Sequence, residues 1–377
     1  MIGQSNSRID FGLLFPATLT DPNLQERCFG RPFQALGREV LRRSISGYSP
    51  ELGHMPHRET GARWLASHGI DAAPSEVFVS DGAQSAFLIL LTALVRPGSR
   101  LLVEELPYLG LKHLCAATNI ELVTVQTDEE GIVPSKLRER AIASGAQVVA
   151  VTPALQNPTG ARMSQRRREQ VVDVARELNL SIVEDAAFDS LYRDMMPALV
   201  SLAPERTLHV ASFSKMVSPS MRVAFVRVPA DRMAQFEALR HSLNISGPSL
   251  EAEVVCQWIQ SGLAKQLCDW QRSEIDRRWR AASAIVPELV KRAGTPAPFC
   301  WALLPNAWRA TDFAGHLRQN NVTVIEAHHF AVGRTNAPEA VRIALTSPTS
   351  MEVFEQGLEI IRRVLDAGPR PAPLHLS

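Results

Sequence analysis

The sequence contains few cysteines, and they are not spaced as pairs. The five cysteines are scattered, odd in number and free of any C-x-x-C pattern. This spacing argues against a disulfide framework and against a structural zinc site. A reducing cytoplasm is the compartment that such cysteine usage predicts. The five residues are Cys28, Cys115, Cys256, Cys268 and Cys300.

An excess of charge of one sign and a long hydrophobic run are absent as well. The chain has 40 basic and 39 acidic residues, a formal net charge of +1, so charge does not favour nucleic acid or an anionic membrane as a partner. The longest apolar run, Ala86 to Val95, is broken by Thr92 and is too short to span a bilayer. The N-terminus shows no basic region followed by an apolar one. We expect a cytoplasmic protein without membrane or nucleic acid partners.

Histidine spacing and a run of arginines give no further site. His54, His57, His328 and His329 do not have a spacing typical of metal ligands, and no metal is predicted. The three consecutive arginines at 166–168 are interpreted as the solvated face of a helix.

The composition is that of a globular protein, with 377 residues, 45% of them hydrophobic, which is long enough for about two domains. From Glu76 onward, short apolar runs alternate with segments of helical periodicity, which predicts an α/β fold with a mostly parallel sheet and helices on both faces. The expected strands are 77–80, 100–104, 121–125, 147–152, 181–184, 207–212 and 222–228, and the expected helices are 83–95, 109–118, 134–144 and 164–178. The last strand is expected to be antiparallel because only a short turn precedes it.

The remaining segments predict three regions. Residues 1–47 are an arm with one helix, 33–43, that joins the small domain; residues 48–270 are the large domain; residues 271–377 are a small α+β domain. A helix at 55–68 opens the large domain, and helices at 231–243 and 249–292, the second broken near Gly262, lead out of it. The small domain is expected to contain strands 299–304, 321–325 and 340–345 and helices 311–319 and 350–365.

One stretch, Ala211 to Arg222, places a lysine, Lys215, among hydroxyl side chains directly after a predicted strand. If packing and a nearby cationic cofactor lower its pKa from about 10.4, a lysine amine forms a Schiff base with an aldehyde. Ser212, Ser214 and Arg222 are suited to binding a phosphate at the same place. The alternative for Lys215 is an ordinary solvated lysine.

Three other strand ends carry informative residues. The segment Ser80 to Gln84 leads from a strand through a glycine into a helix, where free N–H groups suit a phosphate, although Asp81 as a plain N-cap is the alternative. Asn157 precedes a proline and is held extended, so that its amide can donate to a ligand oxygen, whereas a simple Asn-Pro turn is the other interpretation. Asp185 ends an apolar strand, where a carboxylate needs a cationic partner or caps the next segment.

These groups together match one molecule. A phosphate site, a donor to a phenolic oxygen, an acid for a ring nitrogen and an amine for a carbonyl describe pyridoxal 5′-phosphate (PLP). None of the four motifs is specific alone, but parallel strands bring their carboxyl ends to one edge of a sheet.

At these residues the chain resembles the fold-type I PLP-dependent aminotransferases of class I/II, and most of all the aminotransferase domain of MocR-type regulators. The resemblance runs over nearly the whole chain, through the segments 9–11, 46–48, 81–84, 155–160, 212–215 and 341–345. It implies a large domain with a mostly parallel sheet of the seven-stranded type and a small α+β domain.

The resemblance also implies roles for individual residues. Lys215 and Asp185 are the expected catalytic residues, the first as Schiff-base lysine and proton shuttle and the second as partner of the pyridine nitrogen. Arg342 is expected to hold the substrate's α-carboxylate, with Asn157 also at the substrate; structural pairing of Arg342 with a carboxylate is its alternative. The residues expected to bind the cofactor are Tyr48 (from the neighbouring subunit of a homodimer), Gly82, Ala83, Gln84, Tyr108, Asn157, Asp185, Phe188, Ser212, Ser214, Lys215 and Arg222. Tyr108 is otherwise a turn aromatic that packs on the core.

Two features depart from the family pattern. The family usually has a tyrosine two or three residues after the aspartate, where this chain has Ala187 and Phe188. The regulators also carry a winged-helix domain ahead of this region, for which 47 residues are too few.

We therefore expect a PLP-dependent aminotransferase that exchanges an amino group between an amino acid and a keto acid. Another PLP reaction (lyase, decarboxylase, racemase or oxidase) and a non-catalytic PLP-binding amino-acid sensor are the alternatives.

Overall fold

The chain divides into two compact units. The computed structural model describes residues 8–35, 37, 47–192, 196–243, 247–290, 295–305 and 307–369. The larger unit contains Leu19–Asn157 and Ala161–Arg272, and the smaller unit contains Met1–Thr18, Pro158–Gly160 and Ser273–Ser377.

The arm is divided between the two units, and its described residues up to Thr18 group with the smaller one. Residues 1–47 were expected to join the small domain, yet the described residues from Leu19 onward group with the larger unit. Leu19 and Cys28 lie in a buried cluster of that unit, and the indole N–H of Trp258 donates to the Cys28 carbonyl at 2.9 Å. The predicted helix 33–43 lies mostly outside the described residues.

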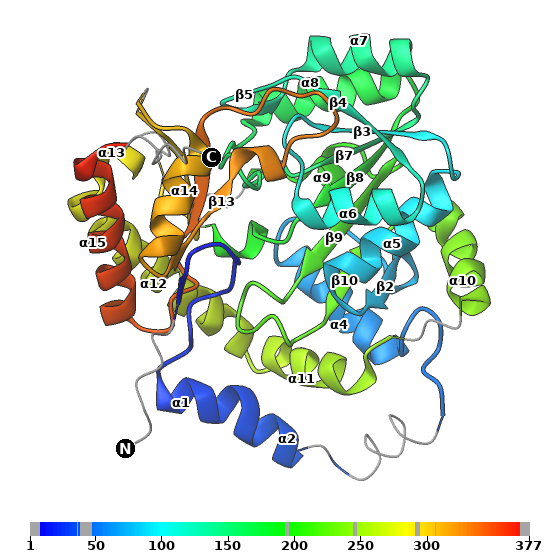
Figure 1. Cartoon of the computed structure of the whole chain (residues 1–377). Coiled ribbons are helices and arrows are strands. Elements are labelled where there is room, and N and C mark those ends of the chain that lie inside the picture. Colours follow the sequence, from blue (N-terminus) through cyan, green and yellow to red (C-terminus); the bar gives the residue numbers. More distant parts are fainter. Residues whose placement is uncertain are drawn as a thin grey trace. The chain divides into compact units, whose positions relative to one another are not determined.

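The centre of the larger unit is a sheet of seven strands in the order β2-β10-β9-β8-β7-β3-β4 (Figure 1). Its strands are β2 (Val77–Ser80), β3 (Arg100–Glu104), β4 (Glu121–Val125), β7 (Val148–Val151), β8 (Ser181–Asp185), β9 (Thr207–Ser212) and β10 (Ala224–Arg227). Strand β10 is antiparallel to both of its neighbours, and the pairs from β9 to β4 are parallel. The predicted mostly parallel sheet with an antiparallel final strand is confirmed.

Helices cover both faces because successive side chains of a strand point to opposite sides. Phe78 and Val226 pack in one cluster with α5 (Gly82–Leu94), α6 (Leu109–Ala117) and α10 (Met233–Ser242), whereas Val77 and Phe225 pack in another with α4 (Met55–Ala66) and α11 (Ser249–Gln260). Farther along that second face, apolar residues of β4, β7 and β8 pack with α7 (Pro134–Ser144), α8 (Gln165–Glu177) and α9 (Leu199–Leu202).

Short elements complete the larger unit. They are α1 (Pro22–Gln25), the π-helix η1 (Glu26–Gly30), α2 (Arg31–Ala35), the hairpin β5 (Thr127–Asp128) with β6 (Gly131–Ile132), and the 3₁₀ turns η2 (Pro74–Glu76), η3 (Asp189–Leu191) and η4 (Ala230–Arg232). The helix break near Gly262 is confirmed: this glycine has a φ of +73° and separates α11 from α12 (Leu263–Ile285).

The smaller unit is built around an antiparallel sheet in the order β11-β14-β13. Its elements are α13 (Pro287–Val290), β11 (Phe299–Leu303), α14 (Ala310–Gln319), β12 (Val322–Thr323), β13 (Ile325–Glu326), η5 (Ala327–His329), β14 (Ala340–Ala344) and α15 (Met351–Ala367). Strand β1 (Ile9–Asp10), which the sequence analysis did not predict, pairs in parallel with β12. The arm therefore contributes a strand of its own to this unit.

The interpretation of the arginine run as a solvated face is wrong for one of its members. Arg168 is buried and donates to the carbonyls of Met163 and Pro197 at 3.3 and 3.1 Å. Buried carbonyls outside regular pairing need donors, and Arg168 supplies them from α8.

The described residues offer neither a metal site nor a membrane-spanning helix. Within the described ranges no three His, Cys, Asp or Glu residues are grouped to hold a metal ion. No helix in the described part of the chain is long and apolar enough to cross a membrane. All five cysteines are buried and unpaired.

Candidate active site

The residues predicted from strand ends meet at one edge of the large sheet. Asp185 is the last residue of β8 and pairs in register with Val210 of the neighbouring strand β9. Ala224 of β10 is paired on one side with Ser80 and on the other with Ser212. The turn after Ser80, the end of β9 and the end of β8 are thus brought together, as the parallel sheet predicts.

Gly82, Ser214 and Arg222 form a compact polar group at this edge. Gly82 begins α5 with a φ of +72°, and a Cβ on it would lie 2.8 Å from Cζ of Arg222. The Arg222 guanidinium donates weakly to Oγ of Ser214 at 3.5 Å, and the Ser214 N–H points at Oγ of Ser212 at 3.3 Å. A helix N-terminus, two hydroxyls and a guanidinium together make a site suited to a phosphate dianion.

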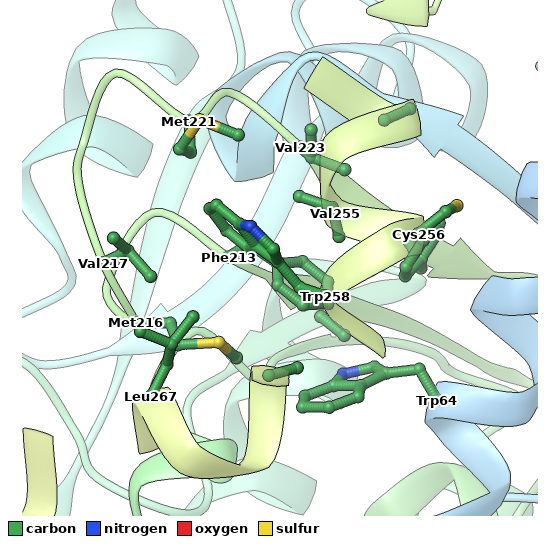
Figure 2. Close-up of a cluster of buried hydrophobic side chains, with 14 of the residues drawn as sticks. Trp64, Phe213, Met216, Val217, Met221, Val223, Val255, Cys256, Trp258 and Leu267 are labelled. Carbon is green, nitrogen blue, oxygen red and sulfur yellow. The ribbon is translucent and has the colours of Figure 1, made fainter. Parts of the chain in front are cut away.

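The loop that carries Lys215 is fixed by the core on both sides of the lysine. Phe213, Met216, Val217 and Met221 are buried, and Figure 2 shows them gathered with Trp258 of α11. The loop also closes on itself, since the N–H of Phe213 donates to the Val223 carbonyl at 3.0 Å. Lys215 itself remains half-buried at the edge of the sheet. Its backbone is therefore anchored while its amine can reach a ligand.

Asp185 and Lys215 are electrostatically coupled. Burial raises the pKa of Asp185 to about 6, whereas the N–H of Ala187 at 3.0 Å and the positive charge of Lys215 lower it. A carboxylate in such a setting is stabilised further by any cation placed next to it. A pyridinium nitrogen would be such a cation.

Tyr108, in the loop after β3, and Gln84 of α5 both pack against Gly110. A Cβ on Gly110 would lie 2.4 Å from Cε1 of Tyr108 and 2.5 Å from Oε1 of Gln84, so only glycine allows this approach. Gln84 donates to the Gly110 carbonyl at 2.8 Å, but its buried Oε1 accepts no hydrogen bond from the residues that the structure describes. A buried acceptor without a donor is rare and points to a ligand or water.

Asn157 and Phe188 are buried, Ala83 is half-buried, and Tyr48 lies at the surface with 84% of its area exposed. Phe188 precedes the 3₁₀ turn η3 just after β8. The burial of these four residues does not test their expected contacts with the cofactor, which stay predictions.

Arg342 lies in the smaller unit. It is 5% exposed on β14, its Nη2 donates to the Gly12 carbonyl at 2.5 Å, and its guanidinium lies 5.3 Å from the ring centre of Phe330. The carbonyl and the ring hold its side chain in a fixed orientation.

Two buried polar pairs near the edge were not predicted. His209 of β9 contacts Glu184 of β8 at 2.9 Å; burial opposes both charges, yet their attraction raises the pKa of His209 and lowers that of Glu184. Glu104, the last residue of β3, accepts hydrogen bonds from Gln156 and from the Thr152 N–H, both at 3.2 Å. Polar residues inside or at the end of an apolar strand were the signals available in the sequence.

Comparison with known proteins identifies the family. The sequence matches the family described as aminotransferase class I and II over residues 29–361. The chain belongs to this family. An uncharacterized HTH-type transcriptional regulator of Bacillus subtilis, YdeF, is 28% identical over 309 residues, which cover 82% of this chain and 67% of that protein. The 2-aminoadipate transaminase of Thermus thermophilus is 26% identical over 293 residues, 75% of this chain and 72% of the enzyme.

A solved structure agrees in fold. LysN, the α-aminoadipate aminotransferase of T. thermophilus, superposes with a TM-score of 0.84 at 22% identity, over 96% of this chain and 92% of the LysN chain. The chain spans only 58 to 67% of the length of three HTH-type regulators that it matches. The predictions of the family and of the fold-type I architecture are confirmed. PLP is the cofactor that this family implies, and the activity of the chain is a proposal.

The residues present fit this cofactor. The Gly82–Arg222 contact leaves no room for a side chain at position 82, and the hydroxyls and guanidinium beside it match a phosphate. The unsatisfied Oε1 of Gln84 and the coupled Asp185 and Lys215 supply the remaining polar chemistry. Together these groups match a ligand that carries a phosphate, an aldehyde and a basic ring nitrogen.

Proposed function

We propose that the protein transfers an amino group from an amino acid to a keto acid, with PLP attached at Lys215. The observation that supports this most is that Asp185 and the group of Gly82, Ser214 and Arg222 lie at one edge of the sheet. At the same edge, burial raises the pKa of Asp185 and the positive charge of Lys215 lowers it. Bound there, PLP supplies an electron sink for the carbanion formed at the substrate Cα.

The protein's own residues supply binding and proton transfer. Ser212, Ser214, Arg222 and the N–H groups at Gly82, Ala83 and Gln84 hold the phosphate, and the ring of Tyr108 stacks on the pyridine. Asn157 donates to the phenolic oxygen and contacts the substrate, while the carboxylate of Asp185 keeps the ring nitrogen protonated. The amine of Lys215, released when the substrate amine takes its place on the cofactor, would take the proton from the substrate Cα and return it to the carbon that carried the aldehyde.

Arg342 is the proposed partner of the substrate's α-carboxylate. Its side chain is fixed by the Gly12 carbonyl and the Phe330 ring, so little conformational entropy is lost when a carboxylate binds. Guanidinium also offers two parallel N–H groups to the two carboxylate oxygens.

The active form is proposed to be a cytoplasmic homodimer with shared sites. Tyr48 is exposed on a loop near the start of the larger unit, where its hydroxyl is available to a second copy of the chain. Its proposed partner is the phosphate of that copy's cofactor.

A second function is favoured by the similarity to HTH-type regulators. In this case the chain binds PLP and an amino acid as a MocR-like sensor without releasing a keto acid. The two proposals share the site and differ in turnover.

One assay separates them. PLP-loaded protein is mixed with single amino acids, including 2-aminoadipate, and the keto acid and the aminated cofactor are quantified. Equal amounts of both, with regeneration of PLP by an added keto acid, are expected. Spectral change on amino-acid binding without keto acid from any amino acid would favour the sensor, and no PLP binding at all would remove both proposals.

A further inference from the structure

The pair Glu104–Gln156 lies at the sheet edge of the proposed cofactor site and has no role in the chemistry described so far. Glu104 is 3% exposed and Gln156 is 2% exposed. Oε2 of Glu104 accepts from Nε2 of Gln156 at 3.2 Å, and Oε1 accepts from the Thr152 N–H at 3.2 Å. The pair therefore joins the end of β3 to the loop that follows β7.

The amide nitrogen of Gln156 has two further acceptors. It donates to the Leu106 carbonyl at 2.8 Å and to the Asn157 carbonyl at 3.1 Å. Three oxygens around one NH₂ group leave a single favourable orientation of the carboxamide, because the flipped amide would place its oxygen against all three. Glu104 thus fixes the orientation of Gln156.

The two backbone acceptors belong to loops that carry proposed cofactor contacts. Leu106 lies two residues before Tyr108, and Asn157 is itself the proposed donor to the phenolic oxygen. The backbone N–H of Gln156 also closes the turn by donating to the Ala161 carbonyl at 2.9 Å. Pro158 restricts Asn157 to extended conformations. The hydrogen bond from Gln156 to the Asn157 carbonyl therefore fixes the direction in which the Asn157 side chain leaves the backbone.

The hydrogen bond between Glu104 and Gln156 does not require a charged carboxylate. Burial raises the pKa of Glu104 to about 8, while the hydrogen bonds from Gln156 and Thr152 lower it and the charge of Asp185 raises it. Near neutral pH the carboxyl is thus largely uncharged, and its burial costs less than that of a carboxylate.

We propose that Glu104 and Gln156 are positioning residues that hold Asn157 and Tyr108 in the arrangement that binds the cofactor. The inference rests on the proposed function, in which Asn157 and Tyr108 contact PLP. It adds two residues, one at the end of β3 and one in the loop after β7, that act on the cofactor through Asn157 and Tyr108.

Two variants test the proposal. Gln156→Glu replaces the donating nitrogen by an oxygen that faces three acceptors, and the nearly isosteric Glu104→Gln removes one of two acceptor atoms. Cofactor-free protein is titrated with PLP by fluorescence quenching, the pH midpoint of the bound cofactor's absorbance is measured, and thermal unfolding of the cofactor-free protein is recorded. Glu76→Gln is the matched control, because Glu76 holds Arg227 at 2.8 Å near the opposite ends of β2 and β10.

The expected results separate positioning from structural support. Gln156→Glu should weaken PLP binding about tenfold or more, as expected for leaving buried polar groups unpaired, and should raise the absorbance midpoint because Asn157 no longer donates to the phenolic oxygen. Glu104→Gln should shift both in the same direction by less, and Glu76→Gln should lower only the unfolding temperature. Unchanged affinity and midpoint in the first two variants would overturn the proposal. If wild-type protein does not bind PLP, it is the proposed function that fails.

Discussion

At the scale of single residues, the site depends on how each polar group is surrounded. Asp185 shows this, because burial raises its pKa to about 6 and the charge of Lys215 works against that rise. A protonated ring nitrogen would add a second cation and shift Asp185 further toward its charged form. The proposed acid–base assignment thus follows from local electrostatics.

Phe188 provides the residue-scale prediction. A hydroxyl that donates to the phenolic oxygen stabilises this anion most when Nζ of Lys215, bound to the cofactor, is unprotonated. Such a donor therefore lowers the pH midpoint of the cofactor's absorbance. Phe188→Tyr should therefore lower the midpoint by about one unit, the equivalent of one charge-assisted hydrogen bond of about 1.4 kcal/mol. A pH titration of absorbance measures it.

The control for this prediction is Phe29→Tyr, which adds the same hydroxyl at an exposed ring beside Trp258. Its midpoint should equal that of wild type. Equal midpoints in wild type and folded Phe188→Tyr would mean that position 188 does not face the phenolic oxygen.

Sequence reasoning predicted polar residues at the strand ends but not the buried polar residues behind them. Lys215, Asp185 and Asn157 follow apolar runs, and parallel strands bring such positions to one edge. The Glu104–Gln156 contact joins residues 52 positions apart, and Glu184–His209 joins residues 25 apart. Contacts of this kind depend on strand order and loop path, which hydrophobic periodicity does not encode.

At the scale of elements, the bounds of the strands in the large sheet were predicted better than the strands of the smaller unit. Strands β2, β3, β4 and β9 begin and end where predicted, because each is a short apolar run between turn residues. Strand β1 has only two residues, Ile9 and Asp10, and is defined by its partner β12 rather than by its own pattern. A two-residue strand leaves no period to detect.

The start of α5 gives the element-scale prediction. Gly82→Ala should weaken PLP binding, because a Cβ at a φ of +72° is strained by about 1–2 kcal/mol and would meet the Arg222 guanidinium at 2.8 Å. Displacing Arg222 moves a residue that is proposed to bind the phosphate. The dissociation constant of PLP should therefore rise, and the thermal stability should fall.

Gly98→Ala is the matched control for this prediction. Gly98 has a φ of +79°, and a Cβ there meets no atom of the described residues within 4 Å. It should lose similar stability from the backbone while PLP affinity stays at the wild-type value. Equal PLP affinity in both variants would contradict the assignment of Gly82 and Arg222 to the phosphate.

At the scale of the whole molecule, the proposal of shared sites is tested by complementation. Chains carrying Tyr48→Phe are mixed with chains carrying Lys215→Ala, so that a hybrid dimer contains one site with both native residues. Transaminase activity should rise above that of either parent, by at most half the fraction of hybrid dimers relative to wild type, because each hybrid has one complete site of two. Activity no higher than the parents, with hybrids verified by mass, would mean that Tyr48 does not complete the neighbouring site.

The covalent attachment of PLP to Lys215 is directly measurable because the chain contains few lysines. Apart from Lys215 it contains only four lysines, Lys112, Lys136, Lys265 and Lys291. PLP-loaded protein is reduced with borohydride, digested, and mapped by mass spectrometry for the phosphopyridoxyl group. We expect this group on Lys215 alone, and we expect the group and the yellow colour to be lost in Lys215→Ala. Stoichiometric labelling of another lysine, or of none while PLP stays bound, would contradict it.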